Sequence, residues 1–355
     1  MVELATGLAK RGHSVRVAVF YRRGPLAAEL ERHGIEVLDL KKKGRWDVAG
    51  FFARTVRLLR RVRPDVLYSY LGGANIVAAA TSRLVPGMRL VWSIRSSNVD
   101  LDRYDWTHRL AYRLECTMSG LPDAIIANSF TGRDFAVAQG FPVGRISVVP
   151  NGIDTGRFRP DTGLRDGQRR AWGLEPHDVA VGILARLDAM KDHSTFLKAA
   201  ALLAKERPDL RFICVGQGPE REALVALVAK LGISSCVLFV GEADPVAALN
   251  GFDVACSSSM TEGFPNAVAE AMACGKPCAV TDAGDSGSIV GDLGAVVETG
   301  DHEALARAII GVIEARSPQR SVAARQRIVD HFSRDAMIEG TLAVFDRTIE
   351  MNRHG

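Results

Sequence analysis

The stretch FDVACSSSMTEGFPNAVAEAMACGKPCAVT, residues 252–281, has the pattern of a strand, a loop, a helix and a second strand. Short apolar runs occupy both of its ends, and the segment between them is amphipathic with the period of a helix. A strand that is followed by a crossover helix and another strand forms a βαβ unit, in which the two strands are parallel. The stretch therefore predicts a parallel sheet with a loop at the carboxyl end of a strand.

The same alternation extends over all 355 residues. Strand-like apolar runs lie at 14–20, 35–40, 65–70, 89–94, 123–128, 146–150, 179–185, 211–216, 237–241, 252–257 and 277–281, with helical patterns between them. Gly, Pro and Asp cluster at 151–163, where the periodicity stops. The expected fold class is α/β, with two Rossmann-like, doubly wound parallel-sheet domains at residues 1–155 and 156–333 and a final helix within 334–355.

The first residues have the pattern of a helix. Residues 2–11 are amphipathic, and Gly12 follows as the expected stop of the helix. A Rossmann-like domain normally opens with a strand and a Gly-rich turn. We therefore expect that a first strand and its loop are missing from the sequence.

The composition excludes several classes of protein. With 45 Lys and Arg, 41 Asp and Glu and 47% hydrophobic residues, the chain is neither disordered nor collagen-like. No apolar run approaches the ~20 residues of a membrane span, and the first residues do not resemble a signal peptide, so we expect a cytoplasmic protein. The six cysteines form no CxxC pair, and the eight histidines lack zinc-site spacing. We expect free thiols, no metal, no cofactor and no nucleic-acid partner.

Positive charge is concentrated in the first part of the chain. Residues 1–155 contain 23 basic and 14 acidic side chains, a net charge of +9, and the remainder has 22 basic and 27 acidic, a net charge of −5. The excess includes Lys41, Lys42, Lys43 and Arg45 and the amphipathic pattern GFFARTVRLLRRVRP at 50–64. A basic half favours an anionic partner, such as a phosphorylated acceptor or the inner face of a membrane. A solvated crossover helix would produce the same pattern, and both interpretations stay open.

The loop at 257–265 carries the first candidate site residues. Glu262 lies in the loop, and a helix is expected to begin near Pro265, a residue favoured at the first helical position. Free N–H groups at a helix start favour a phosphate. Glu270, one turn further on, is placed to accept hydrogen bonds from ribose hydroxyls, and Glu262 is placed near a sugar hydroxyl. The candidate donor-binding residues here are Gly263, Phe264, Pro265, Asn266, Ala267 and Glu270.

Two further candidate segments follow expected strands. Arg186 and Lys191 lie between the run at 179–185 and a helix that begins near His193. Two cations at the carboxyl end of a parallel sheet can neutralise a departing diphosphate. In VGQGPERE, Gly216 and Gly218 separate a strand from a helix, but the third Gly of a dinucleotide fingerprint is absent. We interpret this segment as a turn close to a nucleotide.

Four segments of the chain resemble motifs of a known enzyme family. VPNGIDTGRF, GILARLDAMKDH, VGQGPERE and MTEGFPNAVAEAMACGKPCAVT, in this order, are similar to the retaining GT-B glycosyltransferases of family four, also called glycosyl transferases group 1. The resemblance implies a C-terminal domain that binds a nucleotide sugar, an N-terminal domain that binds the acceptor across a cleft, and a last helix that crosses back to the first domain. It also implies Arg186 and Lys191 at the diphosphate, Glu262 at the donor hexose and Glu270 at the ribose.

The acceptor side departs from the family pattern. Many members carry a His after the fourth strand of the first domain, but this sequence reads WSIRSSNVD, with Arg95 and Ser96 in that neighbourhood. Ser129, in IIANSFTG, lies where an acceptor-side Ser is usual. The DxD pair Asp100 and Asp102 lies in the acceptor half and is interpreted as a polar loop that holds no metal.

The expected reaction is the transfer of a hexose, with retention, from a nucleoside diphosphate sugar to a saccharide or lipid-linked acceptor. UDP is the commonest donor nucleotide in the family that the chain resembles, and the expected role is polysaccharide or envelope glycan biosynthesis. Two alternatives are a sugar-nucleotide epimerase of the same architecture and a non-catalytic scaffold that binds a nucleotide sugar. A nicotinamide dehydrogenase is not favoured, because a GxGxxG motif with a later acidic residue is absent.

Overall fold

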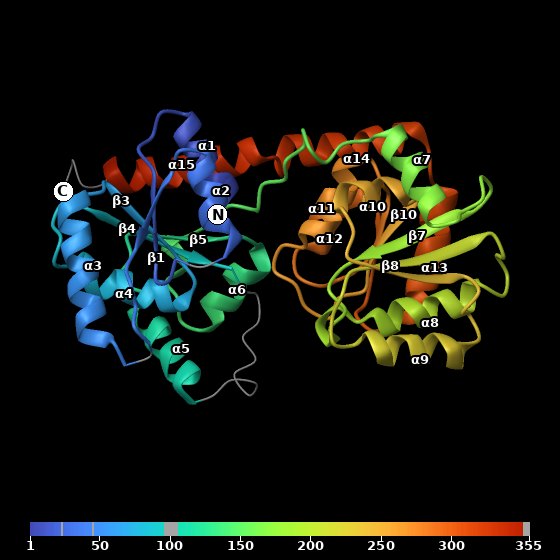
Figure 1. Cartoon of the computed structure of the whole chain (residues 1–355), viewed down its shortest axis with the longest axis horizontal. Coiled ribbons are helices and arrows are strands. Elements are labelled where there is room, and N and C mark those ends of the chain that lie inside the picture. The colour runs from blue at the N-terminus through green and yellow to red at the C-terminus, as the bar shows by residue number, and fades with distance from the viewer. Residues whose placement is uncertain (23, 45, 96–105, 351–355) are drawn as a thin grey trace. The chain divides into compact units, whose positions relative to one another are not determined.

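The computed structural model describes residues 1–22, 24–44, 46–95 and 106–350, and the chain forms two compact units (Figure 1). Unit 1 comprises Met1–Gly152 and Arg334–Gly355, and unit 2 comprises Ile153–Ser333. The chain enters unit 2 at Ile153, whose N–H donates to the carbonyl of Phe332 at 2.8 Å and which forms a parallel bridge with Ser333. The boundary therefore lies three residues before the one that the sequence suggests.

Unit 1 contains two parallel sheets. One pairs β1 (Arg16–Val19) with β2 (Glu36–Asp39). The other has the order β3-β4-β5-β6, formed by Val66–Tyr70, Arg89–Ile94, Ala124–Ala127 and Ile146–Val148. Within the described residues, β1 and β3 each have one edge that pairs with no strand. The expectation of a missing first strand stays a prediction.

Helices cover both faces of unit 1 (Figure 1). One face carries α1 (Val2–Lys10), α2 (Pro25–Arg32) and α15 (Arg334–Glu350), and the other carries α3 (Val48–Val62), α4 (Gly72–Ser82), α5 (Trp106–Met118) and α6 (Phe130–Ala138). Unit 1 has one hydrophobic core on each face of this sheet. Successive side chains of β4 point to opposite faces, so alternate residues of β4 belong to different cores. Val91 packs with Leu4 and Ile338 from α1 and α15, whereas Trp92 packs with Ala79 of α4.

Unit 2 has a six-stranded parallel sheet of order β12-β11-β10-β7-β8-β9. In chain order its strands are Val179–Leu184, Leu210–Val215, Val237–Gly241, Val254–Ser257, Cys278–Thr281 and Ala295–Val297. The last of these, β12, was not expected from the sequence, because three residues at a sheet edge give no readable alternation. The helices are α7 (Thr162–Ala171), α8 (His193–Leu203), α9 (Arg221–Leu231), α10 (Pro245–Gly251), α11 (Asn266–Ala273), α12 (Ser286–Val290), α13 (His302–Glu314) and α14 (Pro318–His331). The α/β class with doubly wound parallel sheets is confirmed.

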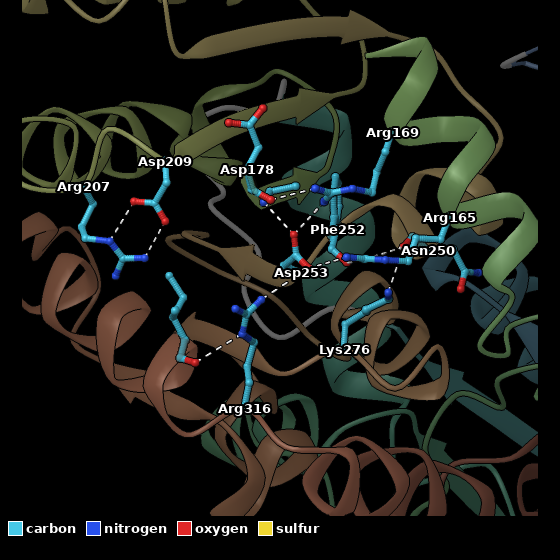
Figure 2. Close-up of polar contacts among 12 residues, drawn as sticks. Arg165, Arg169, Asp178, Arg207, Asp209, Asn250, Phe252, Asp253, Lys276 and Arg316 are labelled. Carbon is cyan, nitrogen blue, oxygen red and sulfur yellow. Dashed lines mark hydrogen bonds and ion pairs between the residues drawn. The ribbon is translucent and has the colours of Figure 1, made fainter. Parts of the chain in front are cut away.

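The amino ends of β7 and β10 are held by an ion cluster around Asp253 (Figure 2). Its carboxylate accepts hydrogen bonds from Arg165 at 2.6 Å and Arg169 at 2.8 Å, and Arg316 lies 3.3 Å away. The N–H of Ala180 in β7 also donates to it, at 2.8 Å. Burial alone would raise the pKa of Asp253, but this N–H and the arginines outweigh burial and lower the pKa below its ordinary value. The cluster thus ties α7 and the start of β10 to the sheet.

Candidate active site

The strand order of unit 2 defines a place for a ligand site. From β7 the chain continues to β8 and β9 on one side, and then to β10, β11 and β12 on the other. The loops that follow β7 and β10 therefore leave the sheet in opposite directions, which creates the crevice where open α/β sheets bind ligands. Arg186 and Lys191 follow β7, and Glu262 follows β10. The two groups of candidate residues thus lie on the two loops of this reversal point.

Lys191 and Glu262 are in direct contact. The ammonium of Lys191 donates to Oε1 of Glu262, which also accepts from the hydroxyl of Ser259 at 2.8 Å. Both side chains are largely buried, so the pair is shielded from solvent more than an ordinary surface ion pair. A cation and a carboxylate that are 71 positions apart in the chain therefore form one polar centre.

Buried hydroxyl groups fix the two loops to each other. Ser258 donates to the carbonyls of Lys191 at 3.1 Å and Asp192 at 2.8 Å, and the N–H of Met260 donates to the carbonyl of Met190 at 2.8 Å. Thr281, at the end of β11, donates to the carbonyl of Ser259 at 2.7 Å. These serines were not expected from the sequence, because a serine run after a strand gives no sign of its partners.

Arg186 is positioned by Asp188 on the same loop. Its Nε donates to the Asp188 carboxylate at 2.5 Å, and 67% of the Arg186 side chain is exposed. Asp188 also accepts from the N–H groups of Met190 at 3.1 Å and Lys191 at 3.2 Å, which forms the short helical turn Ala189–Lys191. Asp188 thus orients both cations of the site, a role that the sequence analysis missed.

The start of α8 combines strain with a buried imidazole. Asp192 has a φ of 42°, which is rare for a residue with a side chain, and its carboxylate caps the helix through the N–H of Thr195. His193 is buried, and neither of its ring nitrogens has a hydrogen-bond partner in the described chain. Burial lowers the pKa of His193 to about 4, although Asp188 and Asp192 oppose the shift. The ring is therefore neutral at pH 7 and adds no charge to the site.

Gly216 and Gly218 lie against the loop that carries Arg186. A Cβ at Gly216 would collide with the carbonyl oxygen of Ala185, and one at Gly218 with the backbone of Leu187. The N–H of Leu187 donates to the carbonyl of Gln217 at 2.9 Å, so the two loops pack backbone to backbone. The structure gives both glycines a packing reason, and a contact with nucleotide stays a prediction.

Replacing Gly218 with alanine is expected to lower the free energy of unfolding by about 1–3 kcal/mol, the usual cost of forcing an extra methyl group into a packed region. The new Cβ would displace Leu187 and with it the loop of Arg186. Urea unfolding of the purified variant measures the change. Gly167→Ala is the matched control, because nothing lies within 4 Å of its Cβ position in α7, and it should leave stability equal or higher. Equal stability of Gly218→Ala and the parent chain would contradict the packing argument.

The segment from Gly263 to Ala267 leads into α11, which begins at Asn266. Pro265 precedes the first helical residue, whereas the sequence suggests that Pro265 itself occupies the first helical position. The ring of Phe264 is buried with its centroid 5.6 Å from that of Phe332, so only the Phe264 backbone is left to face a ligand. The carbonyl of Gly263 accepts from the N–H of Asp285 at 3.0 Å.

A further loop, residues 282–285, borders this segment and was missed by the sequence analysis. Gly284 has a φ of 60°, and a Cβ there would collide with the carbonyl oxygens of Glu262 and Gly263. The signal was present as DAGDSGS, two glycines directly after the expected strand at 277–281. Since that strand is parallel to β10, its following loop lies at the same edge of the sheet.

The carboxylate of Glu270 is placed to accept hydrogen bonds from a ligand. Burial raises the pKa of Glu270, and the charge of Arg157 partly opposes this shift. The carboxylate accepts no hydrogen bond from any described residue of the chain. A half-buried acceptor without an internal partner suits a ligand that brings its own donors, such as hydroxyl groups.

The residues predicted for the acceptor side lie in unit 1. Arg95 donates to Ser93 Oγ at 2.7 Å and to Asn151 Oδ1 at 2.6 Å, and its guanidinium lies over the ring of Tyr70. Ser129 caps the start of α6 and is not exposed. It is fully buried, and its hydroxyl accepts from the N–H of Gly132 at 3.0 Å at the start of α6. Ser96 and the pair Asp100 and Asp102 lie outside the described residues.

Two more observations concern ligands and membranes. In the described ranges, no group of three or more His, Cys, Asp and Glu side chains is arranged to hold a metal ion. Among the same residues, no helix has both the length and the apolar composition of a membrane span.

The candidate site consists of Lys191, Glu262, Arg186 and the start of α11. This arrangement suits a phosphorylated ligand with hydroxyl groups.

Several solved structures share the fold of this chain. Anabaena Alr3699/HepE, solved in complex with UDP, matches with a TM-score of 0.85 and 21% identity over 98% of this chain and 94% of that chain. A glycosyltransferase from Rickettsia africae matches with a TM-score of 0.84 and 16% identity over 98% and 93% of the two chains. The chain has the GT-B fold of these proteins.

The two halves of the chain match two family models. Residues 1–157 match Glycosyltransferase Family 4, and residues 165–328 match Glycosyl transferases group 1. The putative glycosyltransferase EpsD of Bacillus subtilis is 31% identical over 56% of this chain and 54% of its own length. D-inositol 3-phosphate glycosyltransferase 2 of Catenulispora acidiphila is 30% identical over 64% of this chain and 57% of its own. The chain thus spans little more than half the length of these relatives, and its two halves each match one family model.

Proposed function

We propose that the chain transfers a hexose from a nucleoside diphosphate sugar to a hydroxyl group of a saccharide or lipid-linked acceptor. The observation that carries the proposal is the contact between Lys191 and Glu262 at the reversal point of the unit 2 sheet, with Arg186 on the same loop. Cations suit a diphosphate, and a carboxylate suits the hydroxyl groups of a sugar. The two family matches support sugar transfer as the reaction.

UDP is the donor nucleotide that we propose. The solved complexes of Anabaena Alr3699/HepE contain UDP, UDP-glucose, and UDP with glucose, which supports this choice for a chain of the same fold. The basic charge of residues 1–155 supports a phosphorylated or lipid-linked acceptor. We therefore assign the reaction to the assembly of a polysaccharide or an envelope glycan.

In the proposed mechanism, Lys191, Arg186 and the N–H groups at the start of α11 stabilise the charge that develops on the leaving diphosphate. The acceptor hydroxyl attacks from the face on which the diphosphate departs, so the anomeric configuration is retained. The bond from the anomeric carbon to the diphosphate breaks, the glycosidic bond forms, and the departing phosphate oxygen takes the hydroxyl proton. No metal ion takes part in this scheme, and activity that EDTA abolishes and manganese restores would contradict it.

Glu270→Ala is expected to weaken UDP binding by about 10- to 150-fold, which corresponds to the ~1.5–3 kcal/mol of a hydrogen bond to a charged group. The loss follows because the carboxylate that accepts the ribose hydroxyls is gone. Calorimetric titration of the purified chain with UDP, GDP and ADP measures both the preference for the base and the effect of the substitution. Glu222→Ala, an exposed glutamate in α9 of the same unit, is the matched control and should bind like the parent chain.

The outcomes separate the proposed transferase from its alternatives. Binding of UDP that Glu270→Ala does not weaken would remove Glu270 from the site. Absence of binding by all three nucleotides would contradict the proposed function. Conversion of a UDP-sugar to its epimer without any acceptor would identify an epimerase instead.

A further inference from the structure

A groove opens in unit 2 between the edge strand β12 and helix α13, and we call it the α13 groove. Its volume is about 160 Å³. Its walls come from the starts of β11 and β12, one side of α13 and one residue of α14, and they consist of Pro277, Leu293, Gly294, Ala295, Ala308, Gly311, Val312, Ala315 and Arg320. All of these residues except Arg320 are apolar or glycine, so the groove combines apolar walls with a single charge.

The α13 groove lies at the end of the sheet opposite to the candidate active site. Pro277 and Gly294 directly precede β11 and β12, so they mark the amino ends of two parallel strands. The candidate active site is built from loops that follow the carboxyl ends of β7 and β10 in the same sheet. The groove is therefore separate from the site of Lys191 and Glu262.

Gly311 keeps the α13 groove open. It lies in the interior of α13, where glycine is less favourable than alanine. Packing does not require this glycine, because no atom outside the adjacent helical backbone lies within 4 Å of the position that a Cβ would take. Ala308 and Ala315 lie on the same side of the helix, three residues before it and four residues after it. The missing side chain therefore leaves space in the groove that no other part of the unit fills.

Arg320 supplies the charge of the α13 groove, and its side chain is half-buried. Its Nη2 donates to the carbonyl of Asp292 at 2.9 Å, and within the described chain its guanidinium forms no ion pair with a carboxylate. Arg316, by contrast, is directed toward Asp253 (Figure 2). A guanidinium has five N–H donors in a planar fork that matches a carboxylate. The remaining donors of Arg320 are therefore available to an anion.

We propose that the α13 groove binds a small organic carboxylate with a compact apolar group. The volume suits such a group, because a cavity of about 150 Å³ holds a benzene ring. The ring would be removed from water between the alanines of the walls, and the carboxylate would accept hydrogen bonds from the fork of Arg320. A neutral molecule lacks the second contribution, and a bare anion lacks the first. The inference goes beyond the proposed sugar transfer and uses none of its residues.

Calorimetric titration of the purified full chain with sodium benzoate tests the proposal. Benzoate is expected to bind. Benzyl alcohol, which has the ring without the charge, and acetate, which has the charge without the ring, are each expected to bind at least tenfold more weakly. Saturation with UDP should leave the affinity for benzoate unchanged. Absence of benzoate binding, equal binding of benzoate and either probe, or displacement of benzoate by UDP would overturn the proposal.

Two substitutions test the two parts of the α13 groove. Gly311→Leu fills the groove and Arg320→Gln removes its charge, and each is expected to weaken benzoate binding at least tenfold. Arg320→Lys keeps the charge without the fork, so its affinity should be intermediate. The matched controls are Gly167→Leu in α7, where the Cβ position is also open, and Arg307→Gln, an exposed arginine of α13 outside the groove. Both controls should bind benzoate as the parent chain does.

The outcomes keep the α13 groove separate from the proposed function. UDP titration should be the same for all these variants, so failure here is distinguishable from failure of the proposed sugar transfer. Benzoate binding that neither Gly311→Leu nor Arg320→Gln weakens would overturn the proposal. Self-association of the chain that Gly311→Leu abolishes, without benzoate binding, would assign the groove to a contact between copies and reject the carboxylate.

Discussion

Replacing Lys191 with alanine is expected to lower kcat for sugar transfer by about 100- to 1,000-fold, the usual loss when one preorganised charge at a leaving group is removed. Lys191 is held by Glu262 and by the turn that Asp188 organises, so its ammonium does not need to be ordered during the reaction. The measurement is release of UDP from a UDP-sugar in the presence of acceptor. Lys198→Ala, an exposed lysine on α8, is the matched control and should turn over like the parent chain.

A double substitution distinguishes a catalytic Lys191 from one that only supports Glu262. If Lys191 serves solely to neutralise Glu262, then Lys191→Ala with Glu262→Ala should recover part of the activity lost in Lys191→Ala alone. We expect no recovery, because both side chains contact the donor in the proposed mechanism. Near-normal turnover by Lys191→Ala would reject the role of the ammonium at the diphosphate.

Replacing Asp253 with alanine is expected to lower the free energy of unfolding by about 3–5 kcal/mol, the typical cost of removing one partner from a buried ion pair. Arg165, Arg169 and Arg316 would then lie close together without their common carboxylate (Figure 2). Only 11% of the Asp253 side chain is exposed, so water cannot replace it well. Urea unfolding at neutral pH measures the loss.

The ion pair of Arg207 and Asp209, also drawn in Figure 2, provides the control. Both of its side chains are about one-third exposed, so Asp209→Ala should cost only ~0–1 kcal/mol. If Asp253→Ala and Asp209→Ala lost the same free energy of unfolding, burial would not determine how much these ion pairs stabilise the chain.

The Asp253 cluster also predicts the direction of a pH effect. The pKa of Asp253 is lower in the folded chain than in the unfolded one, so its stabilisation is complete above the unfolded pKa of about 4 and is lost as the pH falls through the folded pKa. The parent chain should therefore lose more stability than Asp253→Ala when unfolding is measured below pH 4. A parallel decline in both proteins would contradict the lowered pKa.

Most of the secondary structure could be predicted because apolar runs and helical patterns alternate so regularly. Strands such as Val179–Leu184 lie at the centre of a sheet with helices on both faces, so nearly every side chain in them is apolar. The edge strand Ala295–Val297 carries no such signal. The helix expected near Pro265 begins at Asn266, because proline is tolerated both just before a helix and at its first position.

The site was predictable only in its charged members. Arg186, Lys191 and Glu262 stand out because these charged residues follow buried strands. The structure brings Lys191 and Glu262 into contact, and their roles with a ligand stay predictions. Ser258 could not be found, since its contacts arise from two loops that meet only after folding. Ser129 was predicted to lie on the acceptor side, but a serine just before a helix is also a signal for a helix cap. The structure shows Ser129 in this capping role.

Unit 1 is assembled from segments that precede and follow unit 2 in the chain, and this determines the order in which the units can be completed on the ribosome. Unit 2 is one continuous stretch, Ile153–Ser333, whereas the core of unit 1 combines Leu4 and Leu8 with Ile338 and Val344 from α15. Gly7 lets α15 approach α1 closely, since a Cβ there would collide with Ile338. The unit that is synthesised first therefore waits for the last helix, and the nascent chain can finish unit 2 before unit 1 closes.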